Sequence, residues 1–205
     1  MIKNILFDFD GVILNSMKIK GDGFVELLQE YPKNSVQMLE TYHYANGGVS
    51  RFEKIRYFFH VILQRKTSEQ KIQSLAVQFG EIIAEKLFDP ANLIAETVTF
   101  IKNNYTHYHC HIVSGAEDHE LKELCSHLAI TQYFKSIHGS PTIKSTLITD
   151  LLENNHYRPE NTILIGDSIN DYEAAKVTGV HFYGYNNEKL RLLGNYIETF
   201  SGFQP

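Results

Sequence analysis

The first strand-like segment of the chain constrains the fold most. An apolar run, Ile5-Leu6-Phe7, leads into Asp8 and Asp10, and Gly11 follows them. In a β-strand, residues two apart point the same way, so both carboxylates share one face, and the glycine permits a sharp turn. Two acids at the end of a buried strand are costly unless a cation compensates them, and Mg²⁺ prefers carboxylate and backbone oxygens. The segment therefore predicts a buried strand that ends at a magnesium site.

Outside residues 15–90, strand patterns alternate with helix patterns. The expected strands are Asn4–Asp8, His109–Ser114, Ser136–His138, Thr162–Asp167 and His181–Tyr185. The expected helices are Ala95–Asn103, His119–His127, Lys144–Glu153 and Tyr172–Thr178. Such alternation predicts an α/β fold with a Rossmann-like parallel sheet and helices on both of its faces.

Residues 15–90 contain no strand pattern. Helical spacing recurs there at Phe24–Tyr31, Ser35–Tyr44, Phe52–Arg65 and Ser68–Leu87, and turn-forming residues separate these stretches. We therefore expect two domains. Residues 1–14 and 91–205 form the core, and residues 15–90 form a helical domain inserted after the first strand.

Polar side chains follow three further apolar segments. Asp167 ends one expected strand and Asp171 lies four residues later, Ser114 and Gly115 follow a second strand, and Lys144 opens a helix after a loop. Ligands of parallel sheets bind at the carboxyl ends of the strands, where these residues lie. A hydroxyl, backbone amides and an ammonium group around a metal are what a phosphoryl group needs. The sequence therefore predicts a phosphoryl site at this edge of the sheet.

These residues form four motifs that resemble, in order, those of the haloacid dehalogenase (HAD) superfamily phosphohydrolases. The matching residues are Asp8, Asp10, Ser114, Gly115, Lys144, Gly166, Asp167, Ser168 and Asp171. The resemblance spans residues 5 to about 185. Many relatives carry the third-motif lysine immediately before a proline, whereas here Lys144 stands three residues after Pro141. Lys135 is the other local candidate, but it precedes the expected strand, so we assign the role to Lys144.

The resemblance implies a reaction through an aspartyl-phosphate. Asp8 would attack phosphorus, and Asp10 would protonate the leaving oxygen and later activate water. Ser114 with Gly115 and Lys144 would bind the phosphoryl oxygens. The family's dehalogenases usually lack the second acid of the first motif, so Asp10 favours phosphate chemistry over dehalogenation.

The resemblance also implies a Mg²⁺ site. The carboxylates of Asp8 and Asp167 and the backbone carbonyl of Asp10 would hold the ion. Asp171 would lie in its outer shell or bind a metal-bound water.

The inserted helical segment resembles the C1-type cap of this superfamily. Its stretch from Gly47 to Arg51 resembles a cap segment of β-phosphoglucomutase-like members, in which the arginine meets the distal phosphate of the substrate. Arg51 is therefore the leading candidate for substrate specificity, and Lys54 is the second. The alternative is a loop followed by a helix that Ser50 caps, with solvated charges. Lys18 and Lys20 are expected to be surface lysines.

Three functions remain open. The leading hypothesis is a Mg²⁺-dependent phosphatase acting on a small phosphorylated metabolite, such as a sugar phosphate or a phosphorylated small acid. The alternative is a sugar-phosphate mutase of the β-phosphoglucomutase type, although the segment 15–20 lacks the histidine that those mutases usually carry. The third hypothesis is a non-catalytic HAD-like binding protein.

Composition limits the partners and the location. The net charge is −5 and there is no long basic run, which argues against a nucleic-acid partner. The sequence has no apolar stretch of membrane-spanning length and no signal-peptide pattern at its start, so we expect a cytoplasmic protein without a membrane partner. Cys110 and Cys125 are expected to be buried thiols. The expected partner is a small phosphate ester, and the expected assembly is a monomer or a weak homodimer.

Overall fold

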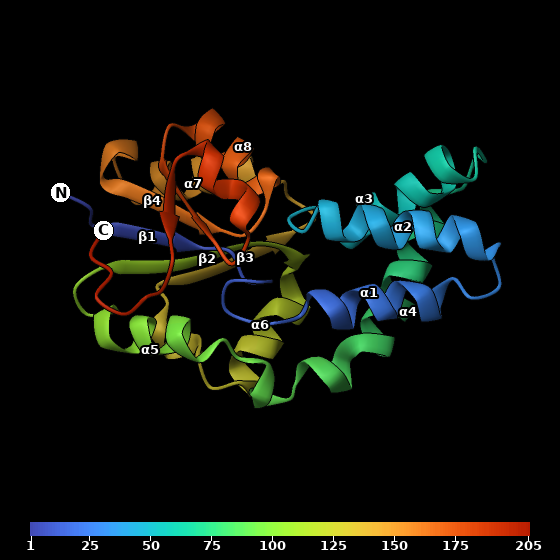
Figure 1. Cartoon of the computed structure of the whole chain (residues 1–205), viewed down its shortest axis with the longest axis horizontal. Coiled ribbons are helices and arrows are strands. Elements are labelled where there is room, and N and C mark those ends of the chain that lie inside the picture. Colours follow the sequence, from blue (N-terminus) through green and yellow to red (C-terminus); the bar gives the residue numbers. More distant parts are fainter.

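The computed structural model describes residues 1–205, and six parallel strands form its central sheet (Figure 1). The strands are β1 (Asn4–Phe7), β2 (His109–Glu117), β3 (Ser136–Ser140), β4 (Thr162–Gly166), β5 (His181–Tyr185) and β6 (Asn195–Ile197). Their spatial order is β3-β2-β1-β4-β5-β6, and every neighbouring pair is parallel. The predicted α/β class with a Rossmann-like parallel sheet is confirmed.

Helices cover both faces of the sheet because the side chains of its strands alternate between two apolar cores. Four helices do so: α5 (Ala95–Asn104), α6 (Asp118–His127), α7 (Lys144–Asn154) and α8 (Ile169–Thr178). From β1, Ile5 and Phe7 join the core that contains residues of α5 and α6, whereas Leu6 joins the core that contains residues of α7 and α8. Figure 1 shows α5 and α6 on one side of the sheet and α7 and α8 on the other. None of the helices combines the length and the apolar character that crossing a lipid bilayer requires.

Four more helices lie between β1 and α5 in the chain: α1 (Met17–Leu27), α2 (Lys33–Ala45), α3 (Arg51–Tyr57) and α4 (Glu69–Leu87). Figure 1 shows them grouped beside the sheet, with α1 next to α4. Between α1 and α4, the rings of Phe24 and Phe79 stack with centroids 4.2 Å apart. At Gly23 a Cβ would overlap the Cγ2 atom of Ile83, so the two helices approach closely only because Gly23 has no side chain. The domain boundaries at residues 15 and 90 stay a prediction.

The two connections between the sheet and the inserted helices run side by side. The amide of Ile94 donates to the carbonyl of Ile13 at 2.9 Å, and the amide of Asn15 donates to the carbonyl of Asn92 at 2.8 Å. An antiparallel bridge joins Leu14 to Leu93 between these bonds. The chain therefore leaves the core and returns to it at one place.

Strand β2 ends at Glu117 rather than Ser114, and α8 begins at Ile169 rather than Tyr172. Three elements differ more from the sequence prediction. Helix α1 begins at Met17 rather than Phe24, because the packing of Gly23 on α4 overrides the poor helix propensity of glycine. The helix expected over residues 52–65 ends at Tyr57 and continues as a π-helical turn over Phe58–Ile62. Strand β6 was not predicted, because three residues are too few to show an alternating pattern.

Candidate functional site

The site begins where β1 and β4 end side by side. The register pairs Phe7 with Ile165, so Asp8 and Asp167 leave neighbouring strands at the same edge of the sheet. The amide of Asp8 donates to the carbonyl of Ile165 at 2.9 Å, which continues the ladder to the acid itself. Gly11 has a φ of +74°, and a Cβ at this position would overlap the Oδ2 atom of Asp167. The glycine of the first motif is therefore needed both for its backbone conformation and for the approach of Asp167.

Three acids converge at this edge. Carboxylate oxygens of Asp8, Asp167 and Asp171 lie within 4.8 Å of one another. Burial and the neighbouring Asp171 raise the pKa of Asp8 to about 7. Burial and the neighbouring Asp8 raise the pKa of Asp167 well above its ordinary value. Asp8 Oδ2 and Asp167 Oδ1 are buried and have no hydrogen-bond partner. Unpaired carboxylate oxygens in a buried cluster suit a hard divalent cation such as Mg²⁺, which would replace the missing partners.

Lys144 is the cation of this cluster. It is the first residue of α7, its Nζ atom lies 2.9 Å from Asp8 Oδ1, and it also pairs with Asp171 Oδ1. Burial lowers the pKa of Lys144, but Asp171 and Asp8 together outweigh burial and raise it, so the ammonium stays charged. Lys135 precedes β3, at the opposite end of the sheet from the acids. The structure therefore places Lys144, and not Lys135, beside Asp8.

The carboxylate of Asp171 is already bound on both of its oxygens. Asp171 Oδ2 accepts hydrogen bonds from the amide of Ser168 at 3.0 Å and from its hydroxyl at 2.6 Å, and Asp171 Oδ1 pairs with Lys144. These contacts form a capping box at the start of α8. Asp171 thus orients Lys144 towards Asp8 through the fixed first turn of a helix. Its predicted role near a metal ion stays a prediction.

The carboxylate of Asp10 lies outside the cluster of three acids. Its Oδ1 atom accepts from the hydroxyl of Ser16 at 2.5 Å, and its Oδ2 atom accepts from Lys20 Nζ at 2.5 Å. Burial would raise the pKa of Asp10, but the Lys20 ammonium and the Ser16 hydroxyl outweigh it and the pKa is lowered. Because its carboxylate lies apart from those of Asp8, Asp167 and Asp171, Asp10 is better placed to transfer a proton than to bind a metal ion through its side chain. The role predicted for its backbone carbonyl stays a prediction.

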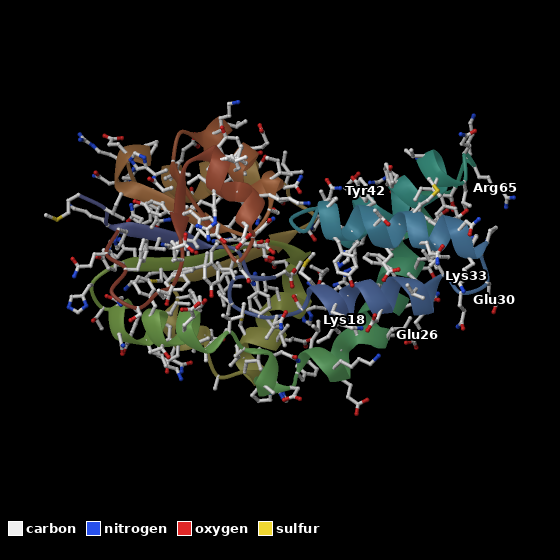
Figure 2. All side chains as sticks on the ribbon, viewed as in Figure 1. Lys18, Glu26, Glu30, Lys33, Tyr42 and Arg65 are labelled. Carbon is white, nitrogen blue, oxygen red and sulfur yellow. The ribbon has the colours of Figure 1, made fainter.

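Lys20 is not the surface lysine expected from the sequence. Its side chain is only 14% exposed and points at Asp10, because Ser16 and Lys20 lie four residues apart on one face of the chain as α1 begins. Lys18 does match the expectation, since its side chain is 79% exposed and pairs with Asp22 on the outside of α1 (Figure 2). The four-residue spacing was a signal in the sequence, but nothing there indicated which face of α1 meets the site.

Ser114 and Gly115 lie in the last part of β2, where its register with β3 shifts, near the same edge of the sheet. Ser114 is buried, and its Oγ atom accepts from the amide of Ala116 at 3.1 Å. A Cβ at Gly115 would overlap the carbonyl oxygen of Gly48, and a Cβ at Gly48 would lie 2.9 Å from Ser168 Oγ. The loop that contains Gly48 therefore lies directly on the core, over the ends of β2 and β4.

Lys54 is buried, and the side chain of Arg51 is only 8% exposed. The guanidinium of Arg51 donates to the carbonyl of Ala76 at 2.9 Å and makes a two-pronged ion pair with Glu120 of α6. Lys54 Nζ lies 3.0 Å from His43 Nδ1 and 3.3 Å from the carbonyl of Gly47. Burial and the nearby Lys20 lower the pKa of Lys54 to about 7.

Arg51 and Lys54, together with Asp10 and Lys20, line a cavity of about 30 Å³. The proposed helix cap at Ser50 is present, since its hydroxyl accepts from the amide of Glu53 at 3.3 Å. The alternative of solvated charges at Arg51 and Lys54 is wrong.

His43 is a further residue that the sequence did not single out. It is buried, its Nε2 atom donates to the carbonyl of Met17 at 2.9 Å, and its Nδ1 atom faces Lys54. Burial and Lys54 lower the pKa of His43 to about 3, so the imidazole is neutral. A single histidine in a helix carries no spacing pattern that would have identified it.

Solved structures share this fold across nearly the whole chain. β-Phosphoglucomutase from Clostridium difficile has a TM-score of 0.81 at 15% identity, covering 100% of this chain and 94% of that chain. A predicted phosphoglycolate phosphatase from Haemophilus somnus has a TM-score of 0.67 at 17% identity, covering 100% and 92%. The HAD-hydrolase YfnB from Bacillus subtilis, solved bound to magnesium, has a TM-score of 0.71 at 18% identity, covering 98% and 96%.

The sequence itself carries the family signature. No curated protein matches the chain. The family described as "Haloacid dehalogenase-like hydrolase" matches residues 5–185, which include every motif residue from Asp8 to Asp171. The chain therefore belongs to the haloacid dehalogenase-like hydrolases.

Proposed function

We propose that this hydrolase is a Mg²⁺-dependent phosphatase that cleaves a small phosphate monoester through an aspartyl-phosphate on Asp8. One observation carries the proposal. Asp8 presents one buried carboxylate oxygen without a partner, Oδ2, while Lys144 holds the other at 2.9 Å. A nucleophile needs a free oxygen in a fixed direction, and the ion pair with Lys144 supplies that fixed direction.

Each neighbour of Asp8 has a part in the reaction. Asp8 Oδ2 attacks phosphorus, and the Lys144 ammonium balances the charge of the carboxylate and of the incoming phosphoryl oxygens. Ser114 and the amide of Gly115, in the last part of β2, bind those oxygens. The carboxylates of Asp8 and Asp167 would hold Mg²⁺, which supplies charge neutralisation and polarises the phosphoryl group when bound.

Asp10 acts as the general acid and then as the general base of the reaction. It gives a proton to the leaving oxygen, and in the second step it takes one from the water that attacks the aspartyl-phosphate. The contacts with Ser16 and Lys20, both at 2.5 Å, hold its carboxylate in place for both steps. The lowered pKa of Asp10 suits its part as a base in the second step, and the proton that it takes from water there is the one that it gives to the leaving oxygen of the next substrate.

Phosphate release from a panel of sugar phosphates, phosphorylated small acids and simple phosphate esters, with and without Mg²⁺, tests the proposal. We expect Mg²⁺-dependent release that Asp8→Asn lowers by roughly a thousandfold or more. Asp150→Asn, an exposed acid on α7, serves as the matched control and should leave the rate unchanged.

Two other outcomes identify the alternatives. An isomerised sugar phosphate without phosphate release would indicate the mutase. Binding without turnover of any ester would indicate a non-catalytic protein. Full activity of Asp8→Asn would refute the mechanism.

A further inference from the structure

A second cavity, of about 230 Å³, lies between α4 and α6. Its walls are mostly apolar: α4 contributes Ile83, Ala84 and Leu87, and α6 contributes Leu121 and Leu124. No motif residue of the reaction lines it. The cavity is therefore a separate space at the boundary between the inserted helices and the sheet.

This apolar cavity shares lining residues with the surroundings of Asp10. Phe9, Lys20 and Arg51 all line it, and Phe9 stands between the two acids of the first motif. Lys20 is the residue whose ammonium lies 2.5 Å from Asp10 Oδ2. Lys20 and Arg51 also line the small cavity that contains Asp10. A molecule in the apolar cavity thus extends towards the residue that protonates the leaving oxygen.

The charges around the cavity disfavour an anionic occupant. Lys20 and Arg51 are each compensated by a carboxylate, that of Asp10 and that of Glu120, so neither offers a free positive charge to a ligand. The exposed Glu81 and Glu123 also line the cavity and oppose a second anionic group on the ligand. The apolar walls and these acids together fit the neutral tail of a molecule whose phosphate lies outside the cavity.

The cavity is kept open beside the ion pair of Arg51 and Glu120. At Gly80 of α4, a Cβ would overlap Glu120 Oε1 and would lie 2.8 Å from Arg51 Nη1. The missing side chain leaves room for the ion pair, whose two residues line the cavity. The volume exceeds the ~150 Å³ of an apolar protein cavity that binds benzene, so a single ring or a chain of about six carbons fits.

We propose that this cavity receives the apolar part of the leaving group, so that the substrate is a phosphate monoester of a neutral, apolar alcohol. The inference rests on the proposed phosphatase function and narrows its substrate class. The P–O bond to the alcohol breaks as Asp8 bonds to phosphorus, Asp10 supplies the proton to the alcohol oxygen, and water then releases phosphate. The product is a neutral alcohol, which an apolar cavity accommodates without an unpaired charge.

A series of alkyl phosphates of increasing chain length measures how much the cavity contributes to kcat/KM. Each buried methylene is worth roughly fourfold, so kcat/KM for hexyl phosphate should exceed that for ethyl phosphate by on the order of 100-fold. A hexitol phosphate, with the same number of carbons but hydroxyls along the chain, should be no better than ethyl phosphate. Equal kcat/KM across the alkyl series, or a preference for the hexitol ester, would overturn the inference and leave the phosphatase function intact.

Two substitutions on α4 test whether the alkyl chain binds in this cavity. Ala84→Leu fills the cavity and should reduce the ratio of hexyl to ethyl phosphate to a few-fold. Val77→Leu is the matched control, because Val77 lies on the exposed side of the same helix, and it should keep the wild-type ratio. An unchanged ratio in Ala84→Leu would place the tail elsewhere and overturn the inference.

Binding measurements test this inference independently of the proposed phosphatase activity. In the Asp8→Asn variant, calorimetry should show that hexyl phosphate binds on the order of 100-fold more tightly than ethyl phosphate, and more tightly than 1-hexanol. If no ester is hydrolysed, the phosphatase function fails and this binding result alone decides the inference. Equal affinity for ethyl and hexyl phosphate, or 1-hexanol binding as tightly as hexyl phosphate, would refute it.

Discussion

Replacing Lys54 with methionine should stabilise the protein at neutral pH and should change how its stability depends on pH. Lys54 is buried among the inserted helices, has His43 and a backbone carbonyl as its closest partners, and lacks a carboxylate partner within bonding distance. Burial and Lys20 lower its pKa from 10.5 to about 7. Methionine has a similar length and no charge, so it fills the same space without that cost.

The magnitude follows from the shift in the pKa of Lys54. Between pH 7 and 10.5 the unfolded chain holds a proton on Lys54 that the folded chain lacks, so the free energy of unfolding rises with pH by up to about 1.4 kcal/mol per unit. Removing the charge of Lys54 should therefore make the free energy of unfolding of Lys54→Met larger than that of the wild type by roughly 4 kcal/mol at pH 7 and by roughly 2 kcal/mol at pH 9.

Urea unfolding at pH 7, 8 and 9 with a chelator present, followed by circular dichroism, measures this difference. Lys18→Met is the matched control, because the exposed Lys18 should give a difference that does not change over this range. The buried thiols titrate identically in the wild type and both variants, so they cancel in the comparison. If the difference in free energy of unfolding between Lys54→Met and the wild type stays constant from pH 7 to 9, the pKa of Lys54 is not lowered and the reasoning is refuted.

Three further predictions concern the acids and the packing. Mg²⁺ at a hundred times its dissociation constant should raise the free energy of unfolding by about 2.7 kcal/mol, and retention of that gain in Asp167→Asn would show that the ion binds elsewhere. Gly23→Ala should cost about 1–3 kcal/mol in urea unfolding, because its Cβ overlaps Ile83, and Ile83→Ala should recover part of that loss in a double-mutant cycle; additive losses would contradict the clash. Asp171→Asn should cost about 3 kcal/mol in thermal unfolding, since it removes a partner from the buried Lys144, and a loss under about 1 kcal/mol would contradict that dependence.

The sequence was sufficient for the parts of the fold that repeat a pattern. The alternation of strands and helices predicted five of the six strands, because each of those runs is long enough to show its apolar character. It placed the start of α1 seven residues too late, because Gly21 and Gly23 look like helix breakers until their contacts with neighbouring helices are known. Strand β6 depends on pairing with β5, which no local pattern records.

In the candidate site, too, the residues at strand ends were predictable from the sequence, whereas those that depend on helix packing were not. Asp8, Asp167 and Lys144 converge as expected, because each follows from a strand end whose place in a parallel sheet is fixed by topology. Ser16 and Lys20 were missed, because only the docking of α1 turns one of its faces towards Asp10.

The partner of Arg51 could not be predicted either. Arg51 was expected to meet a substrate phosphate, and in the structure it pairs with Glu120, which lies 69 residues further along the chain. Contacts of this range arise from tertiary packing and leave no trace in local spacing.

The bridged connections at Leu14 and Leu93 give the inserted helices a modular character. Since the two ends of the insertion emerge side by side, any replacement segment has to satisfy a single short end-to-end distance, and the strand register of the core does not depend on what lies between them. Substitutions and insertions in the helical segment, in evolution or by design, can therefore leave Asp8, Asp167 and Asp171 in place at the edge of the sheet. The exceptions are Ser16 and Lys20 at the start of the segment, because they hold the carboxylate of Asp10, so a replacement segment has to keep these two residues as well as the distance between its ends.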